Sequence, residues 1–287
     1  MTKRTFMSCE EAFGGHQQRS MDFYNHPEKY VIKPFRIFGN LYYVGDKKVC
    51  SHLIDTGDGL ILIDTGYQHS QHLLIESIYS LGFDPRDIKI IIHSHGHFDH
   101  FGAGDFMRAV YGSKIYMSRA DTESLQTHPQ RALMEICPCP LAVICMPDEV
   151  IDDGQVITLG NTSIRCVLTP GHTVGTMSFF FDVSDGQRTL RVANMGGVGL
   201  LTMYKDYCRR DGLPENMAEI MRQSIQKVMD EKADIVLGNH PFQNNTLGKR
   251  QQMIEKSQTN PFVDPDEWRS FLLELDDQVR DFIEQGY

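Results

Sequence analysis

The sequence lacks the features that mark membrane, secreted and disulfide-stabilised proteins. None of its 287 residues belongs to an apolar run long enough to span a bilayer, and residues 1–20 contain no apolar core of a secretory signal. Cysteine is scarce and odd in number, at seven, and no two cysteines form a C-x-x-C pair. We therefore expect a reduced, cytoplasmic protein with no membrane partner.

Positive charge is also scarce. The chain has 28 Lys and Arg against 38 Asp and Glu, which gives a formal net charge of −10, and its basic residues are scattered. Proteins that bind nucleic acid usually gather basic residues into a patch, so we expect no nucleic-acid partner. Apolar residues make up 41% of the chain and charged residues 23%, which is ordinary for a globular protein able to bury a sizeable core.

The predicted elements run in the order sheet, helix, sheet, helix, and this order occurs twice along the chain. Strands are predicted within 35–44 and at 52–54, 60–63, 88–92, 114–117, 156–159, 163–168, 176–183, 189–193 and 235–237, and helices at 71–81, 102–110, 121–126, 217–232 and 268–283. This order predicts an α/β fold in which two sheets pack face to face with helices outside. No long linker interrupts it, so we expect one domain over 1–287, with an N-terminal extension at 1–33 and a C-terminal helical segment at 258–287. Residues 137–148, rich in Pro and Cys, are a candidate loop near a pocket mouth.

The strongest chemical signal is the segment His95-Gly96-His97-Phe98-Asp99-His100, directly after a predicted buried strand. Zinc needs nitrogen or oxygen donors that converge on one point, and a tight H-x-H-x-D-H loop can turn alternate side chains toward two adjacent points. One metal could take His95 and His97, and a second could take Asp99 and His100. Four ligand-type residues within six positions make a chance cluster improbable.

Four other residues could complete or support such a site. His172 and His240 each follow a predicted strand, and with them each metal would have three ligands. Asp64 ends an apolar strand, where an acid either caps a turn or orients a metal-bound imidazole, and we favour the second interpretation. His93 alternates with His95 along one strand and is interpreted as a pocket wall or a support behind the ligands.

Segments 34–45, 59–66, 81–83 and 171–173, together with the histidine segment, resemble the metallo-β-lactamase superfamily. The resemblance is closest to the third subclass of class B β-lactamases and its relatives, and it covers about 35–241. It implies a four-layer αβ/βα sandwich with two zinc ions per chain. It also implies that one zinc is held by His95, His97 and His172 and the other by Asp99, His100 and His240.

Departures from that family pattern bear on the substrate. Many superfamily hydrolases, including glyoxalase-type thiolesterases and tRNA-processing nucleases, place a metal-bridging Asp where residues 191–199 have no carboxylate. Third-subclass β-lactamases typically place serines in this loop to hold the drug's carboxylate, whereas this chain has Gly197 and Gly199. Tyr204 and Phe242 are predicted pocket walls, with simple packing an equal alternative.

These features predict a zinc-dependent hydrolase that uses a metal-bound hydroxide to open a small cyclic or acyl substrate, meaning a lactone, lactam, ester or amide. Asp99 is the predicted catalytic residue, as both ligand and orienter of the hydroxide. Two alternatives stay open: a genuine β-lactamase of the third subclass, and a non-catalytic metal-binding or sensing protein on the same fold. The expected partner is a small molecule, and a homodimer through the N-terminal extension or the terminal helix is a further alternative.

Overall fold

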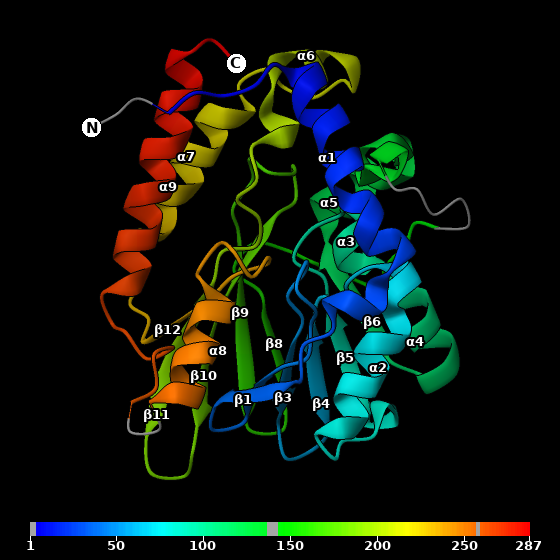
Figure 1. The fold of residues 1–287 in the computed structure, drawn as a ribbon, viewed down its shortest axis with the longest axis vertical. Helices are drawn as coiled ribbons and strands as arrows, with labels where there is room; N and C mark the ends of the chain where they lie inside the picture. The colour runs from blue at the N-terminus through cyan, green and yellow to red at the C-terminus, as the bar shows by residue number, and fades with distance from the viewer. Residues whose placement is uncertain (1–3, 137–142, 257–258) are drawn as a thin grey trace.

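Two β-sheets packed face to face form the centre of the protein in the computed structural model, which describes residues 4–136, 143–256 and 259–287 (Figure 1). The seven-stranded sheet has the order β1-β2-β3-β4-β5-β6-β7, and the five-stranded sheet has the order β12-β11-β10-β9-β8. The strands are β1 (Phe35–Phe38), β2 (Leu41–Tyr43), β3 (His52–Asp55), β4 (Leu60–Ile63), β5 (Ile88–Ile92), β6 (Lys114–Ser118), β7 (Glu149–Ile151), β8 (Val156–Leu159), β9 (Thr162–Leu168), β10 (Met177–Ser184), β11 (Thr189–Asn194) and β12 (Ile235–Leu237). Both sheets mix parallel and antiparallel pairs.

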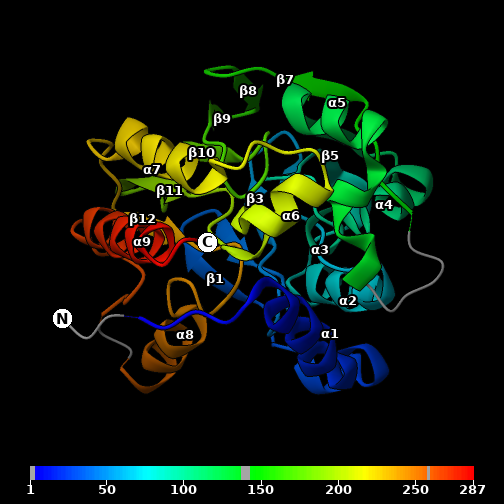
Figure 2. The same ribbon diagram turned by 90° about the horizontal axis from the view of Figure 1, so that it is seen from above.

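Helices cover the outer faces of both sheets. Figure 2 shows α7 and α9 beside the five-stranded sheet, and α2 and α4 on the opposite side of the molecule. The helices are α1 (Cys9–Asn25), α2 (Gln71–Ser80), α3 (Phe98–Phe101), α4 (Gly104–Tyr111), α5 (Arg119–Thr127), α6 (Lys205–Arg210), α7 (Met217–Val228), α8 (Thr246–Glu255) and α9 (Glu267–Glu284). The predicted αβ/βα sandwich is therefore confirmed.

The apolar strands bury side chains on both faces of each sheet. Along β4, Ile61 and Ile63 belong to the core between the sheets, whereas Leu60 and Leu62 belong to the core beneath the helices. Successive side chains of a strand point to opposite faces, so a strand covered on both sides must be apolar throughout. Strand β10 follows the same rule, since Phe180 packs edge-on against Trp268 of α9 with ring centroids 5.6 Å apart.

Strand direction explains where the functional loops gather. Strands β4 and β5 are parallel, and in the other sheet β11 is parallel to β12 while β9 and β11 are both antiparallel to β10. The carboxyl ends of β9, β11 and β12 therefore lie at one edge of their sheet. The loops that follow them meet the loops that follow β4 and β5.

Several elements lie outside the sequence prediction. Helix α1 occupies the segment that we treated only as an N-terminal extension, although its capping box between Ser8 and Glu11 is a recognisable start signal. Strand β7 and helices α3, α6 and α8 were also unpredicted, because each is short or lacks a clean apolar period. Residues 143–148 form no helix or strand, and 137–142 of the predicted loop lie outside the described residues. Within the described part of the chain, no helix has the length and hydropathy needed to cross a membrane.

Candidate metal centre

Five loops at the carboxyl ends of strands build the candidate site. The loop after β5 carries His95, His97, Asp99 and His100, while the loops after β9 and β12 carry one histidine each. The loops after β4 and β11 pack against these residues. Two groups of three possible metal ligands result, and the donor atoms within each group lie within 4.8 Å of one another.

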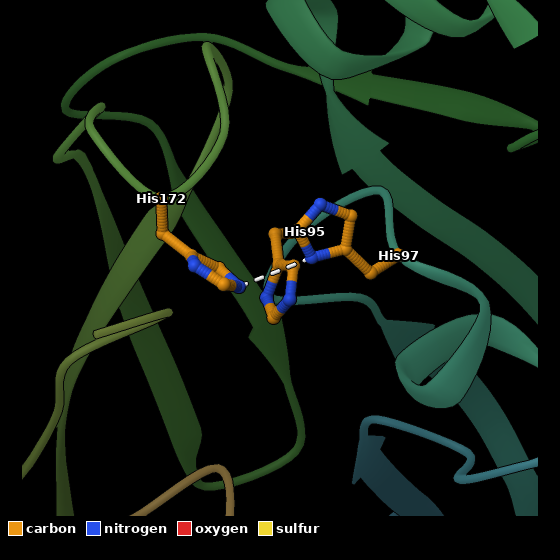
Figure 3. Close-up of side chains that lie close together, drawn as sticks. All are labelled: His95, His97 and His172. Carbon is orange, nitrogen blue, oxygen red and sulfur yellow. Dashed lines mark hydrogen bonds between the residues drawn. The ribbon is translucent and has the colours of Figure 1, made fainter. Parts of the chain in front are cut away.

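The first group consists of His95, His97 and His172. Figure 3 shows the three imidazoles pointing toward one another from the two sheets, with centroid separations of 4.7 Å for His95 and His97 and 4.6 Å from each to His172. The Nδ1 atom of His97 lies 3.0 Å from Nε2 of His172. Three imidazole nitrogens in this arrangement could hold one zinc ion and leave a fourth position open.

The second group consists of Asp99, His100 and His240. The Asp99 Oδ2 atom lies 3.6 Å from Nε2 of His100 and 3.6 Å from Nε2 of His240. The two groups adjoin each other, because the ring centroids of His95 and His100 are only 4.1 Å apart. Two metal ions bound here would therefore be neighbours.

Burial holds most of these histidines in the form that binds metals. It lowers the pKa of His172 to about 4 and that of His97 well below the ordinary value, so both imidazoles are neutral at pH 7 and offer a lone pair. Burial also opposes ionisation of Asp99, but His100 and His240 outweigh it and lower the pKa of Asp99 to about 2. At neutral pH the site therefore combines a carboxylate with mostly neutral imidazoles.

Unpartnered atoms indicate that the pocket is built for a ligand other than the protein itself. The Nε2 atoms of His95 and His100 are buried without any hydrogen-bond partner among the residues that the structure describes. A buried polar nitrogen without a partner costs about 1–3 kcal/mol, and a metal ion at each group would remove that cost. The set of nitrogen donors with one carboxylate suits zinc in particular.

Asp64 supports the second group from behind. Its Oδ2 atom accepts a hydrogen bond of 2.8 Å from Nδ1 of His100, which leaves Nε2 of that ring aimed at Asp99. The same carboxylate accepts bonds of 2.7 Å from the backbone N–H and the hydroxyl of Ser94. Asp64 has φ +59°, a left-handed conformation that costs a non-glycine residue about 1–3 kcal/mol. The geometry is the one predicted for an acid that orients a ligand imidazole.

The loop after β11 orients the first group through its backbone. The carbonyl of Gly196 accepts a hydrogen bond of 2.8 Å from Nδ1 of His95, and that of Gly199 accepts one of 2.7 Å from Nδ1 of His172. Both bonds fix the tautomer that leaves Nε2 free for a metal.

A large cavity of about 1040 Å³ opens above the two groups. Gly197, Gly199 and Phe242 line it, and Phe242 is 80% exposed while its ring stacks on His240 at 5.5 Å. Tyr204 lies elsewhere: its ring packs between Phe282 and Tyr287, and its hydroxyl donates to the carbonyl of Met7.

His93 also lies away from the cavity. It is fully buried, with Nε2 3.4 Å from the hydroxyl of Thr65 and its ring near that of Phe101. Thr65 in turn donates to the carbonyl of His100, so His93 lies behind the second group rather than at the cavity wall.

Other cavity residues were not anticipated from the sequence. His16 and Ser20 of α1 line the cavity, and so does Asn239, whose side-chain amide donates to Ser94 at 3.0 Å. The helix signal at Ser8 could have pointed to α1, but no local pattern shows that this helix crosses to the cavity.

Comparisons with known proteins agree with this fold. Residues 44–185 match the family model of the metallo-beta-lactamase superfamily. The subclass B3 metallo-beta-lactamase BJP-1 of Bradyrhizobium japonicum superposes with a TM-score of 0.79 at 26% identity, over 93% of this chain and 97% of that one. GOB-18, a metallo-beta-lactamase from Elizabethkingia meningoseptica, superposes with a TM-score of 0.77 at 30% identity, over 90% of this chain and 94% of that one.

A curated relative of a different kind is also similar. The probable polyketide biosynthesis zinc-dependent hydrolase PksB of Bacillus subtilis is 28% identical over 145 residues, which is 50% of this chain and 52% of the relative. The match thus spans only about half the length of that relative. Taken with the sandwich of two sheets and the strand-end site, these likenesses show that the chain belongs to the metallo-β-lactamase superfamily.

Proposed function

We propose that this protein is a zinc-dependent hydrolase with two zinc ions per chain, one held by His95, His97 and His172 and the other by Asp99, His100 and His240. The observation that carries the proposal is the adjacency of two complete three-ligand groups at the floor of one cavity. A non-catalytic metal-binding or sensing protein would not need such an open cavity above its ligands.

Zinc bound here would supply a Lewis acid and lower the pKa of a coordinated water to about 7. The protein positions the water relative to the substrate. Asp99, with 13% of its side chain exposed at the cavity, can accept a hydrogen bond from water and turn it toward a substrate carbonyl. His95, His97 and His100 are almost fully buried, so the reacting atoms would meet in a region from which bulk water is largely excluded.

The cavity walls favour a substrate with an apolar substituent. Five partly or fully buried apolar residues line the cavity from the loop after β11 and from α9; they are Val198, Leu200, Leu201, Phe271 and Leu275. The volume of about 1040 Å³ lies at the upper end of the range for small-molecule sites. We therefore infer an ester or lactone that carries an apolar acyl group.

A β-lactamase activity of the third-subclass type is the second candidate, favoured by the likeness to BJP-1 and GOB-18. The position of Gly197 argues against it. A Cβ atom at this position would lie 2.5 Å from Cδ2 of His172, and one at Gly199 would lie 3.1 Å from Cε1 of the same ring. Serines, which would hold a drug carboxylate, cannot enter this loop without moving a proposed zinc ligand.

Substitution of Gly197 by serine is therefore expected to damage the first metal group. Because Gly199 already holds the His172 ring, the ring cannot move aside freely, and we expect zinc affinity at the first group to fall about 10- to 100-fold. Zinc affinity is measured by competition with a chromophoric chelator, and nitrocefin turnover is recorded in parallel. Gly14→Ser, at a helical position with nothing within 4 Å, is the control. Normal zinc affinity with new nitrocefin turnover would show that the loop accepts a serine.

The proposed function is tested by substrate turnover. The zinc-loaded protein is assayed against lactones and esters with acyl chains of increasing length, and against nitrocefin. We expect kcat/KM to rise with acyl length and to exceed that for nitrocefin. Efficient nitrocefin turnover with no activity on lactones or esters would establish the β-lactamase alternative instead.

The cytoplasmic location, the domain boundaries and a homodimer stay predictions.

A further inference from the structure

Asp121 is a buried acid that the function described above does not use. It lies in the first turn of α5 with only 2% of its surface exposed, and it forms no ion pair with any residue that the structure describes. An unpaired buried carboxylate is costly, and burial raises the pKa of Asp121 to about 6. Such a residue persists where its hydrogen bonds have a specific task.

The Asp121 carboxylate connects the two loops that hold the first ligand group. Its Oδ2 atom accepts a hydrogen bond of 2.7 Å from the backbone N–H of Gly96, which lies between His95 and His97. The same oxygen accepts a bond of 2.8 Å from the hydroxyl of Thr173, the residue after His172. Its Oδ1 atom accepts a bond of 2.8 Å from the N–H of Gly175.

These two loops come from different sheets, since one follows β5 and the other follows β9. No strand pairing joins them, and the backbone link next to the ligands is a bond of 2.8 Å from the N–H of Met177 to the carbonyl of Ser94. Asp121 itself is held by the start of its helix, where Ser118 accepts a bond of 3.1 Å from the Asp121 N–H. The contact is also close, because a Cβ atom at Gly175 would lie only 2.3 Å from the nitrogen of Asp121.

We propose that Asp121 is a positioning residue that sets the separation of His95 and His97 from His172 and thereby the metal affinity of the first group. The inference rests on the proposed function, because it assumes that this group binds zinc. Hydrogen bonds to an ionised acceptor are about twice as strong as neutral ones, and ligand positions must hold to within about 0.5 Å. Asp64 contacts a ligand ring of the second group directly, whereas Asp121 acts on the first group through the backbone.

The test measures the two groups separately. In a His240→Ala parent only the first group is complete, and in a His172→Ala parent only the second is. Asp121→Asn is added to each, and zinc affinity of the full chain is measured by competition with a chromophoric chelator. The asparagine side chain has one acceptor oxygen instead of two, so at least one of the three donors loses its partner.

We expect Asp121→Asn to weaken zinc binding about 10- to 100-fold in the first parent and less than about twofold in the second. Asp64→Asn is the matched comparison at the other buried acid. It should weaken the second group most, because Asp64 bonds the His100 ring, with a smaller loss at the first group, because Asp64 also holds Ser94 beside His95. Thr173→Val removes a single bond to Asp121, so it tests the same proposal if Asp121→Asn does not fold, and we expect a smaller loss confined to the first parent.

Equal weakening of both groups, or of neither, by Asp121→Asn or Thr173→Val would overturn the positioning role. If neither parent binds zinc tightly before these substitutions are added, the proposed function itself fails, and the role of Asp121 fails with it. The two failures are therefore distinguishable.

Discussion

Substitution of His97 by alanine is expected to lower kcat/KM about 10⁴-fold, which corresponds to about 5 kcal/mol of transition-state stabilisation. His97 is 2% exposed, and its Nδ1 atom faces Nε2 of His172 at 3.0 Å, so its removal leaves the first group with two donors. The first group can then no longer help to activate water, and the sequence shows no nucleophile motif such as G-x-S-x-G that could take its place. Steady-state kinetics on the best lactone or ester measure the effect.

The control for this experiment is His72→Ala, which removes an exposed histidine of α2 that does not line the cavity. It should retain full activity and two zinc ions per chain. A His97→Ala protein that keeps its activity while losing one zinc would place the reaction at the second group alone and contradict the proposed role of the first group.

Removal of metal is expected to abolish turnover and to lower Tm by about 10 °C. A ligand present at 1,000 times its Kd stabilises the folded state by about 4 kcal/mol, and each kcal/mol shifts Tm by about 2–4 °C in a chain of this size class. The structural reason is specific: without metal, Nε2 of His95 and of His100 are buried with no partner in the described part of the chain. Thermal melts before and after dialysis against a chelator measure the shift.

Adding metal ions back to the metal-free protein is the control for metal removal. Zinc should restore both Tm and activity, whereas Mg²⁺ should not, because Mg²⁺ prefers an octahedral shell of oxygen ligands. A variant that lacks both His97 and His240 should show little change in Tm on dialysis. A native protein whose Tm does not change after complete zinc removal would show that the buried nitrogens need no ion.

Local sequence was sufficient to predict the six proposed ligands and the strands that carry them. One short segment after β5 holds His95, His97, Asp99 and His100. Their residue types and their spacing are therefore both visible in the sequence. His172 and His240 could be found because each follows an apolar run ended by Gly or Pro. The two packed sheets followed from the order of the predicted strands and helices, and the four-layer αβ/βα sandwich followed from the family resemblance.

Other parts of the site were not predictable, because they depend on contacts between segments far apart in the chain. Tyr204 was predicted as a pocket wall or, equally, as a packing residue, and its ring packs against Phe282 of α9 and against Tyr287. His16 was assigned no role, although α1 lies across the molecule from α9 and carries this histidine to the cavity (Figure 1). Neither outcome has a local sequence signal.

The sequence by itself determined the residue types of the proposed ligands, their spacing and the strand ends on which they lie, because these depend on covalent order and on the alternation of side chains along a strand. The family resemblance implied the grouping of His172 with His95 and His97. Only the tertiary structure decided that α1 reaches the cavity, that Tyr204 packs away from it, and that Asp121 contacts both loops of the first group. The physical reason is that the two sheets are joined by packing and by a few long-range loop contacts, such as the backbone bond from Met177 to Ser94, and not by strand pairing. No short segment specifies those contacts.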